Sequence, residues 1–484
     1  MNVNPITVAY PLPELPQIPD RTFHITEYGA EAGVLSLCTS AIQAALDACA
    51  AAGGGTVIIP QGIWRTGPLT MHSRTNLHAQ GGALVQFVPD PVLYPLQPSY
   101  YEGTSGWRCQ SPLDGEGLSD VAITGDGIFD GGGEGWRPVK RFKMTELQWK
   151  KLTSSGGVVD DDGEIWWPSR AAMEGEAYVR SLQESGDTSA EAYLPARAYL
   201  RPVLLSLRNC RRVLLEGPTF QNSPAWNLHP MACEQITVRK VQVRNPWYSQ
   251  NGDGIDLESC SHALVEHCSF DVGDDAICLK SGKDEEGRRL GIPCSYITIR
   301  HCTVYHGHGG VVIGSEMSGG VHAVRVHDCL FMGTDIGLRF KSTRGRGGVV
   351  EDIVMENIDM SGILHEAVSF HMFYAGVEGS EGHDEVLLPV TEETPQFRNI
   401  TLRNIVCQEA DTTLLVNGLP ELPLSELTVE NLQAVSKRGI ILRNGDGLRL
   451  DNISLQTEEL PEVQIHKCSN VSVTNSDQLS ISRS

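Results

Sequence analysis

The chain has few basic residues for its length and no long apolar run. Lysine and arginine together number 38, against 60 aspartate and glutamate residues, which gives a formal net charge of −22 at pH 7 over 484 residues. Nucleic-acid-binding proteins present a basic surface, so this charge argues against a nucleic-acid partner. No segment approaches 18 consecutive apolar residues, and we therefore expect no membrane-spanning helix and no membrane partner.

Two further signals are missing. The 13 cysteines include no Cys-x-x-Cys pair with zinc spacing, and we expect neither a metal site nor another cofactor. The first residues contain no basic stretch followed by an apolar one, the pattern typical of a secretory signal. Several cysteines recur at one phase of a repeat, which indicates small buried side chains rather than a disulfide framework. We expect a reduced, cytoplasmic protein, unless a leader has been removed.

What the sequence does contain is a repeat, most of whose steps are 21 to 29 residues. Each unit is a short strand rich in Val, Ile and Leu, followed by a turn with Gly, Asn or Asp. One unit cannot bury its apolar face alone, whereas stacked units can. The repeat therefore predicts an all-β fold, a right-handed parallel β-helix. Its marker positions are Val213, Ile236, Ala263, Ile297, Val324, Ile353, Ile400, Leu427, Leu448 and Val471.

Segments outside the repeat complete the predicted domain organisation. Residues 1–20 hold five prolines and are expected to form an extended lead-in. Residues 21–484 are expected to form one β-helix domain. Within it, Ser40–Ala52 has helical spacing and ends at three glycines, which predicts a short N-terminal helix capping the first coil. Residues 131–200 break the repeat and are expected to be an insertion near the binding face.

Two segments place carboxylates one repeat apart. Asp253 and Asp275 are separated by 22 residues, about the length of one coil, so their segments can stack as neighbours. Adjacent acids raise one another's pKa, and a group kept protonated near neutral pH can act as a general acid. A paired acid and base is what glycoside hydrolysis requires. Asp256, three positions after Asp253, we assign to the structure rather than to the chemistry.

The second segment needs a special backbone. Asp274 and Asp275 are neighbours, so a regular strand would direct them to opposite faces. Both can face one groove only if the backbone turns there, which Gly273 makes easy.

Motifs along the chain resemble those of the polygalacturonases of glycoside hydrolase family 28. The departures are Gly252, Ala276 and Phe340, none of which removes a group with acid–base or charge chemistry. The resemblance extends weakly to Tyr28–Ala30 and Gly53–Val57 near the N-terminus. The motifs are, in order, Asn222–Trp226, Asn251–Asp253, Gly273–Asp275, Lys280–Gly282, Gly307–Gly309, Ile313–Glu316 and Arg339–Lys341.

The resemblance implies a role for each acid. Asp274 would be the general acid that protonates the leaving oxygen, while Asp253 and Asp275 would hold and deprotonate the attacking water, with inversion at the anomeric carbon. His308, between two glycines, would keep the acids in the right protonation state through hydrogen bonding. Asn251 would orient the substrate or a catalytic aspartate.

Cations would recognise an acidic sugar. Arg339 and Lys341 occupy alternate positions of one strand and so project from the same face, which suits a carboxylate. Arg288 lies in an expected inserted loop, residues 282–291, and would reach a second uronate. The overall negative charge is compatible with an acidic substrate, because charges beyond about 8–10 Å are largely screened at physiological salt.

The resemblance thus implies a hydrolase that cleaves α-1,4-galacturonosyl links in homogalacturonan or its oligomers. The insertion favours exo action, because a wall at one end of an open groove admits only a chain end. Four of the eight tryptophans lie in it, where they would pin it to the β-helix or stack on sugar. Alternatives are a rhamnogalacturonan hydrolase, a Ca²⁺-dependent pectate lyase on the same type of fold, and a noncatalytic carbohydrate-binding β-helix.

Overall fold

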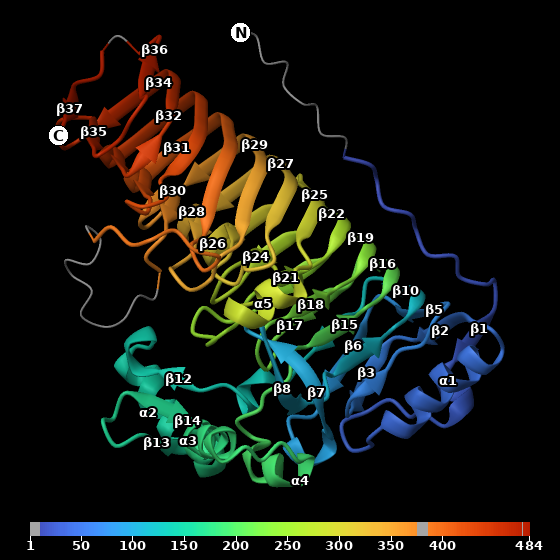
Figure 1. Cartoon of the computed structure of the whole chain (residues 1–484). Helices are drawn as coiled ribbons and strands as arrows, with labels where there is room; N and C mark the ends of the chain where they lie inside the picture. Colours follow the sequence, from blue (N-terminus) through green and yellow to red (C-terminus); the bar gives the residue numbers. More distant parts are fainter. Residues whose placement is uncertain (1–9, 375–385, 477) are drawn as a thin grey trace.

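A computed structural model describes residues 10–374, 386–476 and 478–484. Parallel strands stack along one axis into an elongated coil, with the N-terminal region at one end and the C-terminus at the other (Figure 1). The marker residues pair from coil to coil in the predicted register: Val213 with Ile236, Ile236 with Ala263, and onward to Ile400 with Leu427. The parallel β-helix is confirmed.

The strands form three faces. One face contains the marker residues, and along the coil it consists of β1 (Thr22–His24), β2 (Gly55–Ile59), β5 (Thr75–Ala79), β10 (Ser119–Thr124), β16 (Arg211–Glu216), β19 (Glu234–Arg239), β22 (Ser261–Glu266), β25 (Cys294–Arg300), β27 (Val321–Met332), β29 (Val349–Ser361), β31 (Gln396–Asn417), β32 (Leu424–Arg443), β34 (Arg449–Thr457) and β36 (Ser472–Thr474).

A second face contains β4 (Leu69–Thr70), β9 (Leu113–Glu116), β15 (Leu205–Arg208), β18 (Leu228–Met231), β21 (Ile255–Glu258), β24 (Ile277–Lys280), β28 (Thr334–Lys341), β30 (Glu366–His371), β35 (Val463–His466) and β37 (Ile481–Arg483). The short strand β33 (Gly445–Asp446) pairs with the start of β32 and belongs to the first face. A third, shorter face contains β3 (Gly62–Thr66), β6 (Ala83–Phe87), β11 (Ile128–Asp130), β17 (Thr219–Gln221), β20 (Gln242–Arg244) and β23 (Ser269–Asp271), and β26 (Thr303–Ile313) runs from it into the second face.

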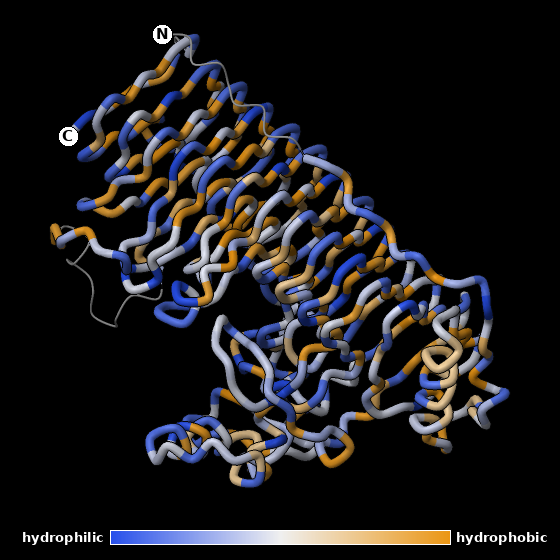
Figure 2. Tube along the Cα trace, turned by 45° about the vertical axis from the view of Figure 1, so that its right-hand side comes forward, coloured by the Kyte–Doolittle hydropathy of each residue, from blue (hydrophilic) through white to orange (hydrophobic). Residues whose placement is uncertain are grey.

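Inward-pointing side chains of the three faces form one continuous core. Apolar and polar residues alternate along the coils, as a strand with one buried side requires (Figure 2). Phenylalanines stack between coils, for example Phe129 on Phe220 and Phe340 on Phe370. All 13 cysteines are free thiols, and all but Cys468 are buried, which confirms their predicted place as small core side chains.

The N-terminal cap is confirmed within one residue. Helix α1 spans Thr39–Ala51 and buries Ile42 and Leu46 against the first coil. It ends where Gly53 adopts a positive φ of 87° and its amide bonds the carbonyl of Ala50. A 3-10 turn, η1 (Ile25–Tyr28), precedes it. Of the predicted lead-in, residues 1–9 lie outside the described residues, and residues 10–19 contain no helix or strand.

The stretch 131–200 leaves the coil and folds beside it, as Figure 1 shows. Trp136 is buried edge-on to Tyr94, which lies outside the insertion, and so helps to pin the insertion in place, whereas Trp166 is buried within the insertion and donates to the carbonyl of Gly156. The helical content was not predicted. Its elements are η3 (Gly133–Gly135), β12 (Val139–Lys140), η4 (Arg141–Lys143), α2 (Glu146–Ser154), β13 (Val158–Val159), β14 (Ile165–Trp167), α3 (Arg170–Ser185), α4 (Ala190–Tyr193) and η5 (Leu194–Ala196).

A second excursion was missed by the sequence analysis. After η2 (Pro91–Leu93), strands β7 (Leu96–Tyr101) and β8 (Thr104–Cys109) form an antiparallel hairpin outside the coil. Its two turn residues, Glu102 and Gly103, both have positive φ, as in the type I′ turns that suit hairpins. The hairpin and the insertion pack on each other through Leu96, Trp107 and Leu200.

The predicted loop at 282–291 is in fact a helix, α5 (Asp284–Leu290). Three acids in its first turn and two arginines in its last turn match the helix dipole, and Gly291 ends it in the left-handed region. None of the helices in the described ranges combines the length and the hydrophobicity needed to cross a membrane.

Candidate active site

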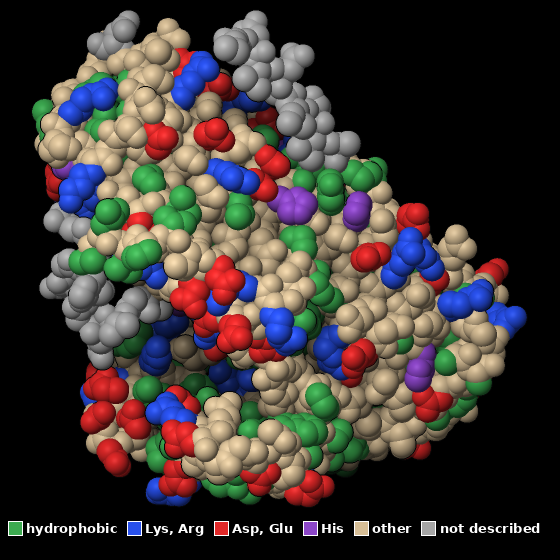
Figure 3. Space-filling model, in the orientation of Figure 1, with side chains coloured by type: hydrophobic (Ala, Val, Ile, Leu, Met, Phe, Trp, Pro, Cys, Tyr) green, Lys and Arg blue, Asp and Glu red, His purple; other side chains and the backbone are tan. Residues whose placement is uncertain are grey.

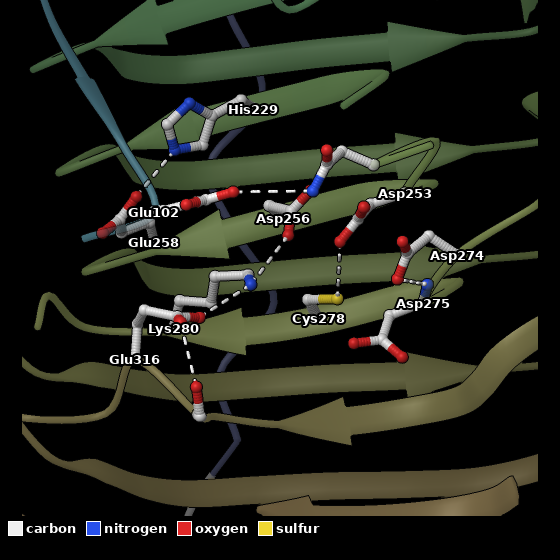
Figure 4. A network of polar contacts seen from close by, with 12 residues as sticks. Glu102, His229, Asp253, Asp256, Glu258, Asp274, Asp275, Cys278, Lys280 and Glu316 are labelled. Atoms are coloured by element: carbon white, nitrogen blue, oxygen red, sulfur yellow. Dashed lines mark hydrogen bonds and ion pairs between the residues drawn. The ribbon is translucent and has the colours of Figure 1, made fainter. Parts of the chain in front are cut away.

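The three predicted catalytic acids meet on the second face of the β-helix. Ile255 pairs with Ile277, so the segments that hold Asp253 and Asp275 stack on neighbouring coils, as the 22-residue spacing predicted. Oxygen atoms of Asp253, Asp274 and Asp275 all lie within 4.8 Å of one another. Figure 4 shows the three carboxyl groups side by side where β21 and β24 begin.

The backbone before β24 turns as predicted, and Gly273 is needed there for space. A Cβ on Gly273 would lie 2.4 Å from the hydroxyl of Ser249 and 2.5 Å from the carbonyl oxygen of Pro246. The carboxylate of Asp274 accepts a hydrogen bond of 3.0 Å from the backbone N–H of Asp275. Glycine therefore lets the chain pass under its neighbour and present both acids to one side.

Asp275 is an ionised carboxylate clamped by two cations. The ammonium of Lys341 lies 2.6 Å from Oδ2 and the guanidinium of Arg339 lies 3.2 Å from Oδ1. Burial opposes ionisation of Asp275, yet these two cations hold its pKa well below its usual range. Arg339 and Lys341 do project from one face of β28, and in this structure that face is directed at Asp275.

Asp253 has the opposite electrostatic character. It is almost fully buried, and its burial together with the charge of Asp274 raises its pKa well above the ordinary value. Its Oδ2 lies 3.9 Å from the thiol of Cys278, while its Oδ1 has no hydrogen-bond partner among the described residues. Asp275 and Asp253 thus differ in protonation: the pKa of Asp275 is lowered, so it is charged, and the pKa of Asp253 is raised, so it retains its proton more readily.

His308 lies against Asp274. Its Nδ1 is 3.2 Å from a carboxylate oxygen of Asp274, and its Nε2 is 3.8 Å from Asp335. The hydrogen bond to Asp274, opposed by burial, raises the pKa of His308. The side chain of Asp274 is 21% exposed, more than those of its two partners, so it is the acid that a bound substrate can reach. This geometry is compatible with the predicted roles of the pair.

Behind the three acids lies a buried layer of charged residues. It includes Asp256, to which the sequence analysis gave a structural role. Lys280 is 3.0 Å from Glu316 and 3.6 Å from Asp256, and its ammonium sits 4.6 Å above the ring of Trp226. Figure 4 shows Lys280 between Asp256 and Glu316, and beside them Glu258, which His229 contacts at 2.8 Å. Burial raises the pKa of Asp256 to about 7, against the opposing charge of Lys280.

Asn251 and Arg288 lie at the margins of this centre. The side-chain oxygen of Asn251 accepts a hydrogen bond of 3.0 Å from Arg201, and its amide is 3.5 Å from the carboxylate of Glu102. Arg288 donates to the carbonyl oxygens of Gly345 and Arg346, which ties α5 to the following turn. The substrate contacts predicted for Asn251 and Arg288 stay predictions.

One cation at the site, Lys143, was not among the predicted site residues. Lys143, at the end of η4 in the insertion, reaches across to the backbone carbonyl of Gly273 at 3.5 Å. Burial lowers the pKa of Lys143, against the opposing charges of Asp274 and Asp335. The only signal in the sequence was that the insertion precedes the catalytic coils, and nothing in its composition marked this lysine.

Among the described residues, two groups have the spacing to hold a metal ion: Asp253, Asp274 and Asp275, and the buried trio of Asp253, Asp256 and Cys278. The first group already has Lys341 and Arg339 on Asp275. Two cations in contact with one carboxylate leave less negative charge for a divalent ion. The electrostatics therefore favour acid–base chemistry over calcium binding at this place.

Comparison with known proteins places these residues in a family. The sequence model of glycosyl hydrolases family 28 matches residues 107–439. The chain is 27% identical to a probable polygalacturonase from Vitis vinifera over 84% of its length and 73% of the relative's. It is 25% identical to an exo-poly-alpha-D-galacturonosidase from Dickeya chrysanthemi, over 81% of its length but only 62% of that protein's.

A solved structure resembles the whole chain. The crystal structure of a hyperthermoactive exopolygalacturonase from Thermotoga maritima superposes with a TM-score of 0.78 at 29% identity, covering 92% of this chain and 94% of that one. A family 28 exopolygalacturonase from Yersinia enterocolitica, with a TM-score of 0.71 at 22% identity, shows the same fold over 94% of this chain and 78% of its own. Because the family model covers more than half of the sequence, the chain belongs to glycosyl hydrolases family 28.

Proposed function

We propose that this glycoside hydrolase cleaves α-1,4-galacturonosyl links of pectin-derived homogalacturonan or its oligomers, acting from a chain end and with inversion. The observation that carries the proposal is the joint presence of three carboxylates and two cations on one face, with Asp274 within reach of solvent and Arg339 and Lys341 beside Asp275. Carboxylates supply the acid–base chemistry of glycoside cleavage, and the cations suit an acidic sugar. The names of the relatives support the same substrate class.

The protonation states support a division of work. Asp274, partly exposed and hydrogen-bonded to His308, is placed to protonate the leaving oxygen. Asp275, held as a carboxylate, suits the base that takes a proton from water, and Asp253, whose pKa is raised, suits a hydrogen-bond donor to that water. A carboxylate with a lowered pKa is a weak base, so the water loses its proton late, as the bond to the leaving group breaks.

Inversion depends on where that water sits. In inverting enzymes with two carboxylates, these are about 6.5–9.5 Å apart to leave room for the water. Here the three acids are closer, within 4.8 Å at their oxygen atoms. We therefore place the water beside Asp253 and Asp275, on the sugar-facing side, rather than between the acid and the base. Proton NMR of the first product anomer tests this placement: the β-anomer supports inversion and the α-anomer contradicts it.

Exo action is supported by two walls at one end of the site. The tip of the β7–β8 hairpin contacts α5, where Lys283 donates to the carbonyl of Gly103 and Ser105 donates to Glu286. On its other side, the indole of Trp107 donates to the carbonyl of Thr188 in the insertion.

Between the hairpin and the insertion lies a cavity of about 750 Å³, whose lining reaches Asn251, two residues from Asp253. Figure 3 shows the hollow between the insertion and the β-helix, with Lys and Arg side chains inside it. A polysaccharide that follows the groove toward the hairpin meets this walled cavity, which has room for a chain end rather than for a continuing chain.

The decisive experiment is a reducing-sugar assay on defined oligogalacturonides, with rhamnogalacturonan and neutral galactan as comparison substrates. Release of galacturonate from the oligomers, with little or no release from the others, is the expected outcome. Cleavage of rhamnogalacturonan alone would replace the proposed substrate, and an ultraviolet-absorbing product would indicate a lyase.

A further inference from the structure

The cations on the catalytic face differ in how far they are committed to acids of the protein itself. Arg339 and Lys341 both bond Asp275, and Lys280 bonds Glu316 and lies near Asp256. Lys280 is therefore offset by buried carboxylates, whereas Arg339 and Lys341 share the one carboxylate of Asp275, which leaves a single positive charge between the two of them. A substrate with one carboxylate per sugar unit requires positive charge that is still available when it arrives.

Lys143 adds a second available positive charge beside the predicted catalytic acids. Its ammonium bonds only a neutral carbonyl, that of Gly273, at 3.5 Å, and no carboxylate of the described residues lies within 4.0 Å of it. It is half-buried and faces Asp274 and Asp335, whose charges favour its protonated form against the effect of burial. The long bond to Gly273 can be exchanged for a stronger one to an anion.

The position of Lys143 is built into the insertion. Its backbone carbonyl accepts a hydrogen bond of 2.9 Å from the indole of Trp247, which projects from the turn before Asn251. Two residues later, Thr145 begins α2 with a capping box that it forms with Gln148. The lysine backbone is therefore held from both sides, while its side chain remains free to change partner.

We propose that Lys143 binds a carboxylate of the galacturonan chain on the Asp274 side of the scissile bond. This inference rests on the proposed function and adds to it: the insertion supplies substrate recognition at the reacting bond as well as a wall at the end of the groove. The ammonium leaves the carbonyl of Gly273 and forms a charge-assisted hydrogen bond with the sugar acid. Asp274 then has a neutralised uronate beside it rather than a repelling one.

The test compares three variants on oligogalacturonides. Lys143→Met keeps the length of the side chain and the backbone bond to Trp247 but removes the charge, Lys143→Arg keeps the charge, and Lys150→Met alters an exposed lysine on α2 of the same insertion. Loss of a hydrogen bond to a charged group predicts a rise in KM of about 10- to 100-fold for Lys143→Met, with a much smaller change in kcat. Lys143→Arg should recover most of the affinity, and Lys150→Met should behave as the parent enzyme.

Two outcomes would overturn the inference. An unchanged KM in Lys143→Met would show that the ammonium does not meet the substrate. A loss confined to kcat, with displaced limbs of the pH–rate profile, would show that Lys143 acts on Asp274 and His308 instead. If the parent protein cleaves no galacturonide, the proposed function fails by itself. Calorimetric titration with trigalacturonate then decides the inference: weaker binding by Lys143→Met supports it, and equal binding or none overturns it.

Discussion

Lys341 and Asp275 form an ion pair of 2.6 Å whose side chains are 8% and 2% exposed, so β28 is tied directly to a predicted catalytic acid. The pair does more than neutralise charge. Burial disfavours both ions, and each is kept charged by the other, which lowers the pKa of Asp275 and raises that of Lys341. Lys341, which is predicted to bind the substrate, would thus also keep the predicted catalytic acid Asp275 ionised.

Replacing Lys341 by Ala should therefore affect activity and stability together. Removing one partner of a buried pair typically costs about 3–5 kcal/mol when the other charge is left unpaired; here Arg339 still contacts Asp275, so we expect a smaller cost. We expect a clear loss of galacturonan cleavage, a lowered Tm, and no gain of activity on neutral galactan. Kinetics and thermal unfolding would check this, with Lys150→Ala as the surface control. Wild-type activity at a lowered Tm would assign Lys341 to stability alone.

Asp274 should be the most sensitive acid for turnover and the least sensitive for folding. General acid–base help contributes about 10²–10⁴-fold, and we expect Asp274→Asn to lower kcat by that factor. Because its side chain is partly exposed, Tm should change little. Asp161→Asn, on an exposed turn of the insertion, is a matched control. A folded Asp274→Asn enzyme with near-native kcat would remove Asp274 from the mechanism.

The pair of His308 and Asp274 makes a prediction about pH. The hydrogen bond to Asp274 raises the pKa of His308 above its ordinary value of 6.5, so the folded state binds this proton more tightly than the unfolded state does. The resulting stability is fully present below about pH 6.5 and is lost as pH rises through the folded pKa.

NMR titration of histidine-labelled protein can follow this group, with His308→Gln identifying its signal. The pKa should lie above 6.5 in the parent enzyme and should fall in Asp274→Asn, since the carboxylate that raises it is gone. A pKa that is indifferent to Asp274→Asn would contradict the predicted coupling.

Asp256 also has a raised pKa, so its contribution to stability changes with pH in the same direction as that of His308. Its pKa is raised by burial to about 7, above the ordinary value of 3.8, so the folded state holds a proton that the unfolded state gives up. Its contribution to stability is therefore greatest below about pH 4 and is lost as pH rises toward 7. Asp256→Asn, which is neutral at every pH, should flatten the dependence of Tm on pH over this window. An unchanged slope would show that Asp256 is ionised throughout.

Much of the architecture could be predicted because the repeat is written in the sequence. Val213, Ile236 and Ala263 keep one phase, and stacking of identical coils leaves little freedom in register. Asp253 and Asp275 came together for the same reason. Gly273, directly before Asp274 and Asp275, signalled the turn that presents both of these acids to one side.

The parts that escaped prediction are those that leave the repeat. The β7–β8 hairpin has only a Glu-Gly turn as its signature, and α5 is a short helix whose charged ends resemble an ordinary loop. Lys143 and Asp274 are 131 residues apart in the sequence, and packing of the insertion brings their charges close enough to interact. No local pattern encodes such a long-range approach. Secondary-structure propensity describes residues that are close in the sequence, and the repeat period describes residues that stack on adjacent coils. The contacts of the hairpin and of the insertion belong to neither kind.

Exo action can be tested by removing one of the two segments that are proposed to close the groove, the β7–β8 hairpin. In the parent enzyme, we expect monogalacturonate as the main early product from a long polymer, with viscosity falling slowly relative to released reducing ends. Removal of the hairpin should change this product profile. Replacing residues 97–108 by a short Gly-Ser link removes the hairpin that meets α5 and the insertion. The groove would then open past Asn251, and mixed oligomers should appear early.

The control must separate an opened groove from a damaged fold. Trp107→Phe keeps an aromatic ring between the hairpin and the insertion but loses the hydrogen bond to Thr188, so it should leave the product profile unchanged. Circular dichroism would confirm that the β-helix persists in the shortened variant, because the hairpin lies outside its strands. Product analysis at low conversion decides the matter. An early ladder of mixed oligomers from the parent enzyme would contradict exo action, and a monomer-only profile from the shortened variant would show that other walls close the groove.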